Sequence, residues 1–253
     1  MYQRSAPSGR RLANVVETIW VSRADNANGF EVLLPTGRPQ LVLHLDPAKP
    51  EALIQGPTTA STVIDASMQC LAAGVALLPG GLTALTGEAA LDFTDQQVPV
   101  RDVLGLDVGG LIEAVRAELL QGSTTIAIER TLQQQLAMVD REPPETIRRS
   151  AALLDGGLGV AEVCGHLGVT RSRFVGSFRS EVGMNPKLYS RLKRFERALA
   201  RVRNSQAPGL AAIAARSGYA DQAHMTREFT EFTGRSPSLL HRDASPAPNH
   251  LQP

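Results

Sequence analysis

Polar and apolar side chains alternate along SGYADQAHMTREFTEFTGRSP, residues 217–237, in a way that separates two faces of a helix. Met225, Phe229 and Phe232 recur at helical spacing and predict one buried stripe. The side chains at 223, 226, 227 and 230 must then point outward. Arg227 on that face has the chemistry of a base reader, because a guanidinium can donate two hydrogen bonds to guanine O6 and N7. A phosphate contact or a solvated arginine is the alternative.

A related segment lies about fifty residues upstream. Laying VAEVCGHLGVTRSRFVGSFRSEVGMNP, residues 160–186, over residues 210–237 pairs Gly168 with Gly218 at an offset of 50. In each copy a small residue stands four positions before this glycine, as expected for two short helices that cross closely at a turn of positive φ. Cys164 is therefore better explained as a small buried residue than as a reactive thiol.

Each copy predicts a helix-turn-helix, a unit whose second helix enters the DNA major groove. These recognition helices are expected at about 171–182 and 222–233, with Thr170 and Asp221 as their N-caps. Between the copies, residues 186–204 carry one apolar stripe surrounded by lysines and arginines and predict a long helix that fixes the separation of the units. Its basic side chains either contact phosphates or only solvate the helix.

Charge is distributed unevenly along the chain. Residues 1–145 hold 10 Lys+Arg against 17 Asp+Glu, a net −7, whereas residues 146–253 hold 16 against 8, a net +8. Basic charge gathered in one domain is typical of a nucleic-acid binder, although a solvated basic surface has the same composition. Two distant cysteines, no signal-peptide pattern and no apolar run of membrane-spanning length predict a cytoplasmic protein without membrane contact.

The first half has a different pattern. Residues 15–78 contain short apolar or alternating runs separated by turn-forming residues, which suggests a small sandwich or barrel. Helical patterns follow at 108–120 and 125–139, and the Pro-rich DREPPE, residues 140–145, ends them. The predicted fold class is α+β, with a β-rich domain and trailing helices over 1–140, an all-α module over 146–243 and a disordered tail over 244–253.

Residues 146–240 resemble the DNA-binding module of the AraC/XylS family of bacterial transcription regulators, with GYADQAHMTREFTEFTGRSP as the most specific motif. The resemblance implies seven helices and two recognition helices in successive major grooves. The base-reading positions that it implies are Ser172, Val175, Gly176, Gln222, Ala223, Thr226 and Arg227. Val175, Gly176 and Ala223 lack hydrogen-bonding heads, so the first helix is expected to read shape and methyl groups more than base edges.

The first half resembles a cupin-like domain of unknown function that precedes AraC-type modules. IW at 19–20, LPTGRPQLVLHL at 34–45, QGP at 55–57 and GVALLPGG at 74–81 carry this resemblance, which spans roughly residues 10–138. It implies a sensor or oligomerisation role. The expected partner is double-stranded DNA, and the further candidates are an unknown small-molecule effector, RNA polymerase if the chain is an activator, and a second copy of the chain.

Basic residues on the flanks or end of the outward face of the first recognition helix, and on the long helix that follows it, are the candidates for phosphate contacts. They are Arg171, Arg173, Arg179, Lys187, Arg191, Lys193 and Arg194. Single substitutions of Arg171 or Arg173 are expected to weaken binding to all sequences alike.

Residues for catalysis are not apparent. A single histidine, His44, occurs in the first half and cannot complete a metal site, so no enzyme, metal or cofactor is predicted. Trp20 and His44 are candidates for a ligand pocket, although a lone Trp or His in an apolar strand is more often a core residue. The alternative function is a cupin-like small-molecule-binding protein or enzyme with an accessory helix-turn-helix module.

Overall fold

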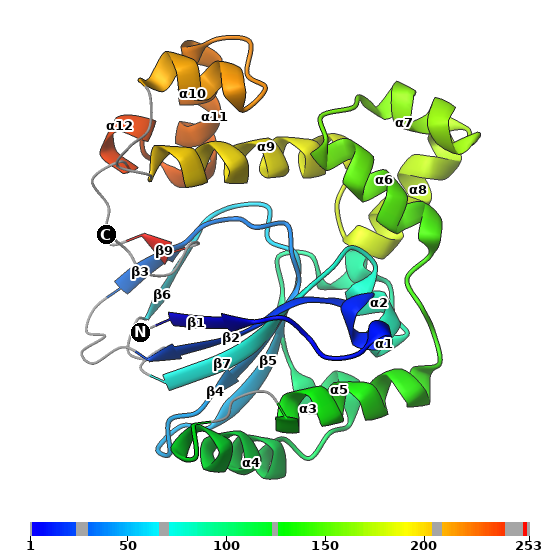
Figure 1. Cartoon of the computed structure of the whole chain (residues 1–253), viewed down its shortest axis with the longest axis vertical. Coiled ribbons are helices and arrows are strands. Elements are labelled where there is room, and N and C mark those ends of the chain that lie inside the picture. The colour runs from blue at the N-terminus through cyan, green and yellow to red at the C-terminus, as the bar shows by residue number, and fades with distance from the viewer. Residues whose placement is uncertain are drawn as a thin grey trace.

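The chain folds into a sheet-rich part and a helical part, as the sequence predicts (Figure 1). The computed structural model describes residues 2–23, 30–65, 71–122, 126–203, 209–240 and 250–251. Cys70 and most of the expected tail lie outside the described residues. The sheet-rich part ends with α5 at Val139 and the helical part begins with α6 at Glu145.

Two antiparallel sheets form the first part. The larger sheet has the strand order β1-β2-β7-β4-β5-β8, and the smaller one has the order β6-β3-β9. The strands are β1 (Tyr2–Ser5), β2 (Val16–Arg23), β3 (Phe30–Leu33), β4 (Gln40–His44), β5 (Glu51–Gln55), β6 (Thr62–Asp65), β7 (Leu71–Leu77), β8 (Gln97–Pro99) and β9 (His250–Leu251). Strands β1, β5 and β8 are not among those that the sequence predicts.

Side-chain alternation along β2 shows how the larger sheet is covered. Ile19 and Val21 face a core that α4 and α5 complete, because successive side chains point to opposite faces of a strand. Trp20 lies on the other face, directly over Gly74 of β7, where a Cβ would stand 2.6 Å from the indole ring. A glycine is therefore required beneath this tryptophan.

The helices of the first part pack along one side of the larger sheet (Figure 1). They are α1 (Arg10–Ala13), α2 (Gly81–Thr86), the 3-10 helix η2 (Ala90–Phe93), α3 (Val100–Leu104), α4 (Val108–Leu120) and α5 (Ile126–Val139). The helices predicted over 108–120 and 125–139 are thus confirmed as α4 and α5. Their apolar residues recur every three or four positions, which places Ile112 and Leu132 in the same buried cluster as the sheet.

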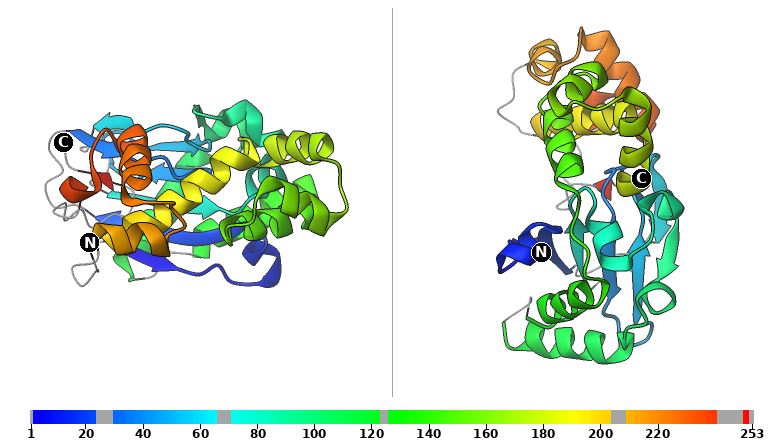
Figure 2. Two further views of the ribbon diagram at one scale, coloured as in Figure 1. Left: turned by 90° about the horizontal axis from the view of Figure 1, so that it is seen from above. Right: turned by 90° about the vertical axis from the view of Figure 1, so that its right-hand side faces the viewer.

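The second part contains seven helices among the described residues, which is the number implied by the resemblance. They are α6 (Glu145–Asp155), α7 (Val160–Leu167), α8 (Arg171–Val182), α9 (Pro186–Val202), α10 (Leu210–Arg216), α11 (Gln222–Thr233) and α12 (Pro237–Leu240). Helix α9 joins the two helix-turn-helix units, α7–α8 and α10–α11, which lie at its opposite ends (Figure 2).

The last described residues depart from the predicted tail. Residues 250–251 form β9 and pair with β3, with Leu251 opposite Val32 and His250 opposite Leu33. The end of the chain therefore returns to the sheet-rich part. A sequence of two apolar or aromatic residues in a Pro-rich stretch gives no periodicity from which this pairing could be predicted.

The two parts share a hydrophobic core. Leu34, which follows β3, is 3% exposed and belongs to the buried cluster of the helical part. Gly37 is packed so closely that a Cβ would stand 3.2 Å from side-chain atoms of Leu192 and Met184. The hydroxyl of Thr94 adds a hydrogen bond of 2.6 Å to the carbonyl of Gly183, at the end of α8. The core of the helical part is consequently completed by the sheet-rich part.

We predict that Leu34→Ala destabilises the full chain by about 2–5 kcal/mol, because it leaves a cavity in a core shared by both parts. Urea unfolding followed by circular dichroism measures this change. The matched control is Leu120→Ala, since Leu120 is 90% exposed and its truncation should change stability by less than about 0.5 kcal/mol. Equal effects of the two substitutions would contradict a shared core.

Candidate nucleic-acid interface

The first helix-turn-helix unit presents a polar face on α8. Phe174 and Phe178 are buried, with ring centroids 5.5 Å apart in an edge-to-face arrangement. Ser172 and Gly176 are exposed and Val175 is half-buried. The turn before α8 contains Gly168 at φ 64°, which confirms the predicted positive φ.

N-capping differs between the two recognition helices. The carboxylate of Asp221 accepts a 2.6 Å hydrogen bond from the backbone N–H of His224, which confirms the predicted cap of α11. Thr170 has the extended backbone of an N-cap, but its hydroxyl makes no cap hydrogen bond. The first backbone N–H groups of α8 therefore receive no hydrogen bond from the Thr170 side chain, and the residues around them are exposed to solvent.

The second unit has the same division into faces. Met225, Phe229 and Phe232 are at most 3% exposed, which confirms the predicted buried stripe on α11. The four side chains implied as base readers lie near the beginning of α11 or on its outer face. Gln222, Ala223 and Arg227 are exposed and Thr226 is half-buried. The turn glycine, Gly218, has φ 85°.

A buried carboxylate fixes α11 on α9. Glu228 is 3% exposed and accepts hydrogen bonds from Nε of Arg191 at 2.8 Å and from Nη2 of Arg194 at 2.9 Å. Arg191 also pairs with Glu231, and the guanidinium of Arg194 lies 4.6 Å from the ring centre of Tyr219. The arginines of α9 therefore hold the second unit in place.

These contacts determine the ionisation of Glu228. Burial alone raises the pKa of a carboxyl group, but the hydrogen bonds from Arg194 and Arg191 outweigh burial and lower the pKa of Glu228 below its ordinary value. Glu228 is thus charged at neutral pH and is paired with the guanidiniums of Arg191 and Arg194.

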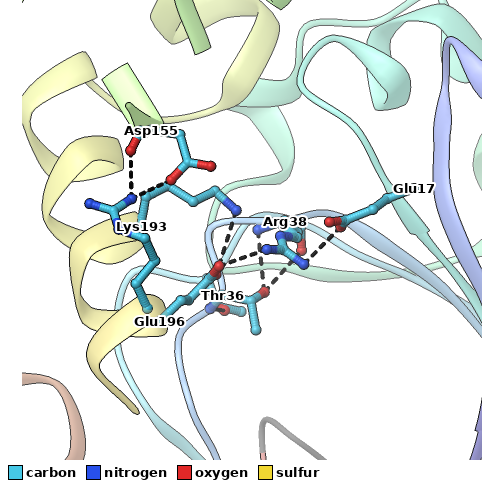
Figure 3. A network of polar contacts seen from close by, with 8 residues as sticks. Glu17, Thr36, Arg38, Asp155, Lys193 and Glu196 are labelled. Atoms are coloured by element: carbon cyan, nitrogen blue, oxygen red, sulfur yellow. Dashed lines mark hydrogen bonds and ion pairs between the residues drawn. The ribbon is translucent and has the colours of Figure 1, made fainter. Parts of the chain in front are cut away.

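A second ionic network joins α9 to the sheet-rich part (Figure 3). Arg38, between β3 and β4, lies 2.7 Å from Glu17 of β2 and 2.7 Å from Glu196 of α9. Lys193 donates a hydrogen bond of 3.1 Å to the same Glu196 carboxylate. Burial and the nearby Arg38 lower the pKa of Lys193, and Glu196 counteracts them.

The candidates for phosphate contacts consequently divide into two groups. Four remain exposed around the first unit, namely Arg171, Arg173, Arg179 and Lys187. In the other group, Lys193 is 7% exposed and held by Glu196, and Arg191 and Arg194 are held by Glu228. The ammonium of Lys193 lies inside the junction of the two parts, and its contact with phosphate stays a prediction. The sequence of α9 could not reveal partners that other segments supply.

Trp20 and His44, the candidates for a ligand pocket, lie on one face of the larger sheet. Trp20 is 8% exposed, packs with Val42 and Ala72, and stacks on Tyr2 at 6.1 Å between ring centres. His44 pairs across the sheet with Ala72 and is also nearly buried. The structure thus brings the two side chains to the same region, and a ligand there stays a prediction.

Within the described ranges, no three His, Cys, Asp or Glu side chains are grouped so that they could hold a metal ion. No helix in the same part of the chain is both long and apolar enough to cross a bilayer.

Comparison with known proteins gives two family matches. Residues 163–243 match the model of a helix-turn-helix domain, and residues 3–99 match that of a domain of unknown function, DUF6597. The C-terminal domain of AraT, a response regulator from Geobacillus stearothermophilus, is similar at 22% identity and a TM-score of 0.37, over 39% of this chain and 85% of that one. ToxT from Vibrio cholerae is similar at 10% identity and a TM-score of 0.44, over 94% of both chains. No curated protein matches the chain.

We predict that Glu228→Gln lowers the stability of the full chain at neutral pH by about 1–3 kcal/mol, because it leaves two half-buried arginines without their shared carboxylate. The pKa of Glu228 is lower in the folded chain than its ordinary 4.5, so its contribution is complete above that pH and is lost as the pH falls through the folded value. Denaturant unfolding at several pH values measures both effects.

Glu231→Gln is the matched control for this prediction. Glu231 pairs with Arg191 but its side chain is 57% exposed, so its loss should cost less than about 1 kcal/mol. The free energy of unfolding of both variants could depend on pH as that of the unmodified chain does. The pairing of Glu228 with Arg191 and Arg194 would then not contribute to stability.

Proposed function

We propose that this chain, which matches a helix-turn-helix domain behind an N-terminal DUF6597 domain, is an AraC-type DNA-binding transcription regulator. It reads a specific DNA sequence with α8 and α11 in successive major grooves. The observation that carries the proposal is the exposure of a polar face on both recognition helices, at opposite ends of one helix. In the helix-turn-helix, this face of the second helix contacts the bases.

The length of α9 supports binding to adjacent turns of one DNA face. Its 17 residues span about 25 Å at the rise of an α-helix, and the recognition helices lie beyond its two ends. Glu228 and the shared aromatic core hold α11 on α9, with the rings of Phe195 and Phe229 4.9 Å apart. The spacing of the units is therefore set by the protein before DNA binds.

We propose different tasks for the two recognition helices. In α11, Arg227 and Gln222 are exposed and carry long hydrogen-bonding heads suited to guanine and adenine edges. In α8, Gly176 stands where α11 has Arg227, and the exposed cations nearby are Arg171 and Arg173. The second helix thus supplies sequence recognition and the first supplies mainly phosphate contacts.

The sheet-rich part, residues 1–140, is proposed as a sensor or dimerisation domain. Residues 146–243 are proposed as the DNA-binding module, but Leu34 belongs to the hydrophobic core of that module. The unit to be tested for DNA binding is therefore the full chain.

We predict that Arg227→Ala relaxes preference at one or two base pairs by about 1–3 kcal/mol, because it removes a bidentate contact with a base. Arg171→Ala and Arg173→Ala should instead weaken binding to all sequences similarly and reduce the salt slope by about 1 each. Affinities for an operator series with single-base changes, obtained by selection from random DNA and measured at two salt concentrations, separate these effects.

The matched control is Arg130→Ala, which removes an exposed arginine from α5 in the sheet-rich part. It should leave both base preference and salt slope unchanged. If Arg171→Ala erased preference at particular bases while Arg227→Ala lowered all affinities evenly, the tasks of α8 and α11 would be the reverse of those proposed.

We also predict two subsites about 10 base pairs apart, one turn of B-DNA, because α9 holds the units rigidly on one face. Inserting five base pairs between the subsites should rotate one of them to the opposite face and abolish simultaneous binding, whereas inserting ten preserves the face but exceeds the reach of the module. Footprinting on these operators measures the effect. A single short protected site on the original operator would count against two-unit binding.

A further inference from the structure

The C-terminal end of α8 is buried against the sheet-rich part. Gly183, which follows the last residue of α8, has φ 83°. A Cβ on this glycine would overlap Cγ of Pro57 and stand 2.9 Å from the carbonyl oxygen of Ala90. The hydroxyl of Thr94 donates a hydrogen bond of 2.6 Å to the carbonyl of Gly183. Pro57, Ala90 and Thr94 thus form one surface around η2, which we call the η2 surface, and α8 ends against it.

Helix α8 packs more extensively on η2 than on its neighbours in the helical part. Among the described elements, α6, α7 and α9 also contact α8, but each over a smaller surface than η2 does. Helix α2 of the sheet-rich part packs on α8 as well, and Figure 1 shows the end of α8 directed toward it. Arg141, between the two parts, lies 2.6 Å from the carboxylate of Glu181, which is 8% exposed. The first recognition helix is therefore attached to both parts of the chain.

The η2 surface is rigid because its two segments are tied together. The backbone N–H of Asp95 donates a hydrogen bond of 3.1 Å to the carbonyl of Pro57. Asp95 has φ 56°, a left-handed conformation, and its carboxylate accepts hydrogen bonds from the backbone N–H and the hydroxyl of Thr59 at 2.7 and 2.6 Å. Phe93 is 3% exposed and packs in the core of the sheet-rich part. The η2 surface consequently moves together with the larger sheet.

The second recognition helix is held differently. Gly234 follows α11 as Gly183 follows α8, at an offset of 51, and has φ 70°. A Cβ on Gly234 would meet open space. The elements on which α11 packs most extensively are α9, α10 and α12, and all belong to the helical part. The same helix end is thus covered by the sheet-rich part in the first unit and open in the second.

We propose that the η2 surface positions α8 for DNA binding, with Thr94 and Pro57 as positioning residues that act through Gly183. The residues of α8 assigned to DNA, at 171–176, lie 7 to 12 positions from Gly183, which is about 10–18 Å along a helix. A tilt of α8 about its anchored end displaces these residues most, and hydrogen bonds weaken steeply as distance and angle depart from the optimum.

The two parts of the chain then divide the work of holding the recognition helices. The sheet-rich part sets the affinity of α8 for the first subsite, whereas Glu228 and α9 hold α11 for the second. This inference rests on the proposed function and deepens it, because it assigns the sheet-rich part a direct role in one of the two DNA contacts.

The test compares the affinities of the full chain for two duplexes. One is the operator selected from random DNA, and the other is shortened so that it keeps only the subsite whose base preference depends on Arg227. The ratio of the two dissociation constants measures the contribution of α8, and a loss of folded protein leaves that ratio unchanged. Gly183→Ala should reduce the ratio roughly fivefold to tenfold, because the added methyl group displaces α8 from Pro57. Thr94→Val keeps the shape but removes the hydrogen bond, and should reduce it roughly twofold to fivefold.

Gly234→Ala is the matched control, since it places the same methyl group on the same left-handed backbone in open space. It should leave the ratio of the unmodified chain. The proposal is overturned if Thr94→Val, or Gly183→Ala where that variant folds, leaves the ratio unchanged, or if Gly234→Ala reduces it as much as Gly183→Ala does. An unmodified chain that bound neither duplex would instead refute the proposed function, and the role of the η2 surface with it.

Discussion

Several charged side chains of α9 are buried or half-buried, and a charge removed from water must be paired. The free-energy cost of removing an unpaired ion from water exceeds the stabilisation from its packing contacts. Each such group therefore requires a partner of opposite charge from another segment. Arg38 and Lys193 share Glu196 at the junction of the two parts, and Arg191 and Arg194 share Glu228 at the second unit. Because α9 contributes to both networks, its position fixes the sheet-rich part and α11 together.

This pairing changes how the basic charge of the second half is to be understood. The net +8 of residues 146–253 suggests a uniformly cationic surface. Of the basic side chains proposed for phosphate binding, however, the exposed ones lie around the first unit, and Arg191, Lys193 and Arg194 of α9 are held by carboxylates. In the proposed function, electrostatic attraction to DNA is therefore assigned to the exposed cations of α8 and base recognition to Arg227 of α11. The fold uses the charges of Arg191, Lys193 and Arg194 for its own assembly.

The sequence predicted an element and its buried face where the apolar residues of one segment followed a single helical periodicity. Met225, Phe229 and Phe232 predicted the buried face of α11, and the stripe over 108–120 predicted α4. Strands β1 and β8 escaped prediction because short edge strands need no apolar alternation. The ionic network around Lys193 could not be predicted for a different reason, since α9 itself contains a single acid and the other members of the network come from distant segments. Leu34 likewise looked like a strand residue of the first part, and only the tertiary structure assigns it to the second core.

Aromatic rings join the start of α9 to the recognition helix α8. Tyr189 packs on Phe178, and Phe178 packs on Phe174 of the same helix α8, with ring centres 5.3 and 5.5 Å apart. Close-packed rings transmit a displacement to their neighbours because the interior offers little free volume. Helix α11 is held independently, through Glu228. A displacement of α9 at Tyr189 is therefore transmitted first to α8, the helix that carries the exposed Arg171 and Arg173 and has Gly176 where α11 has Arg227.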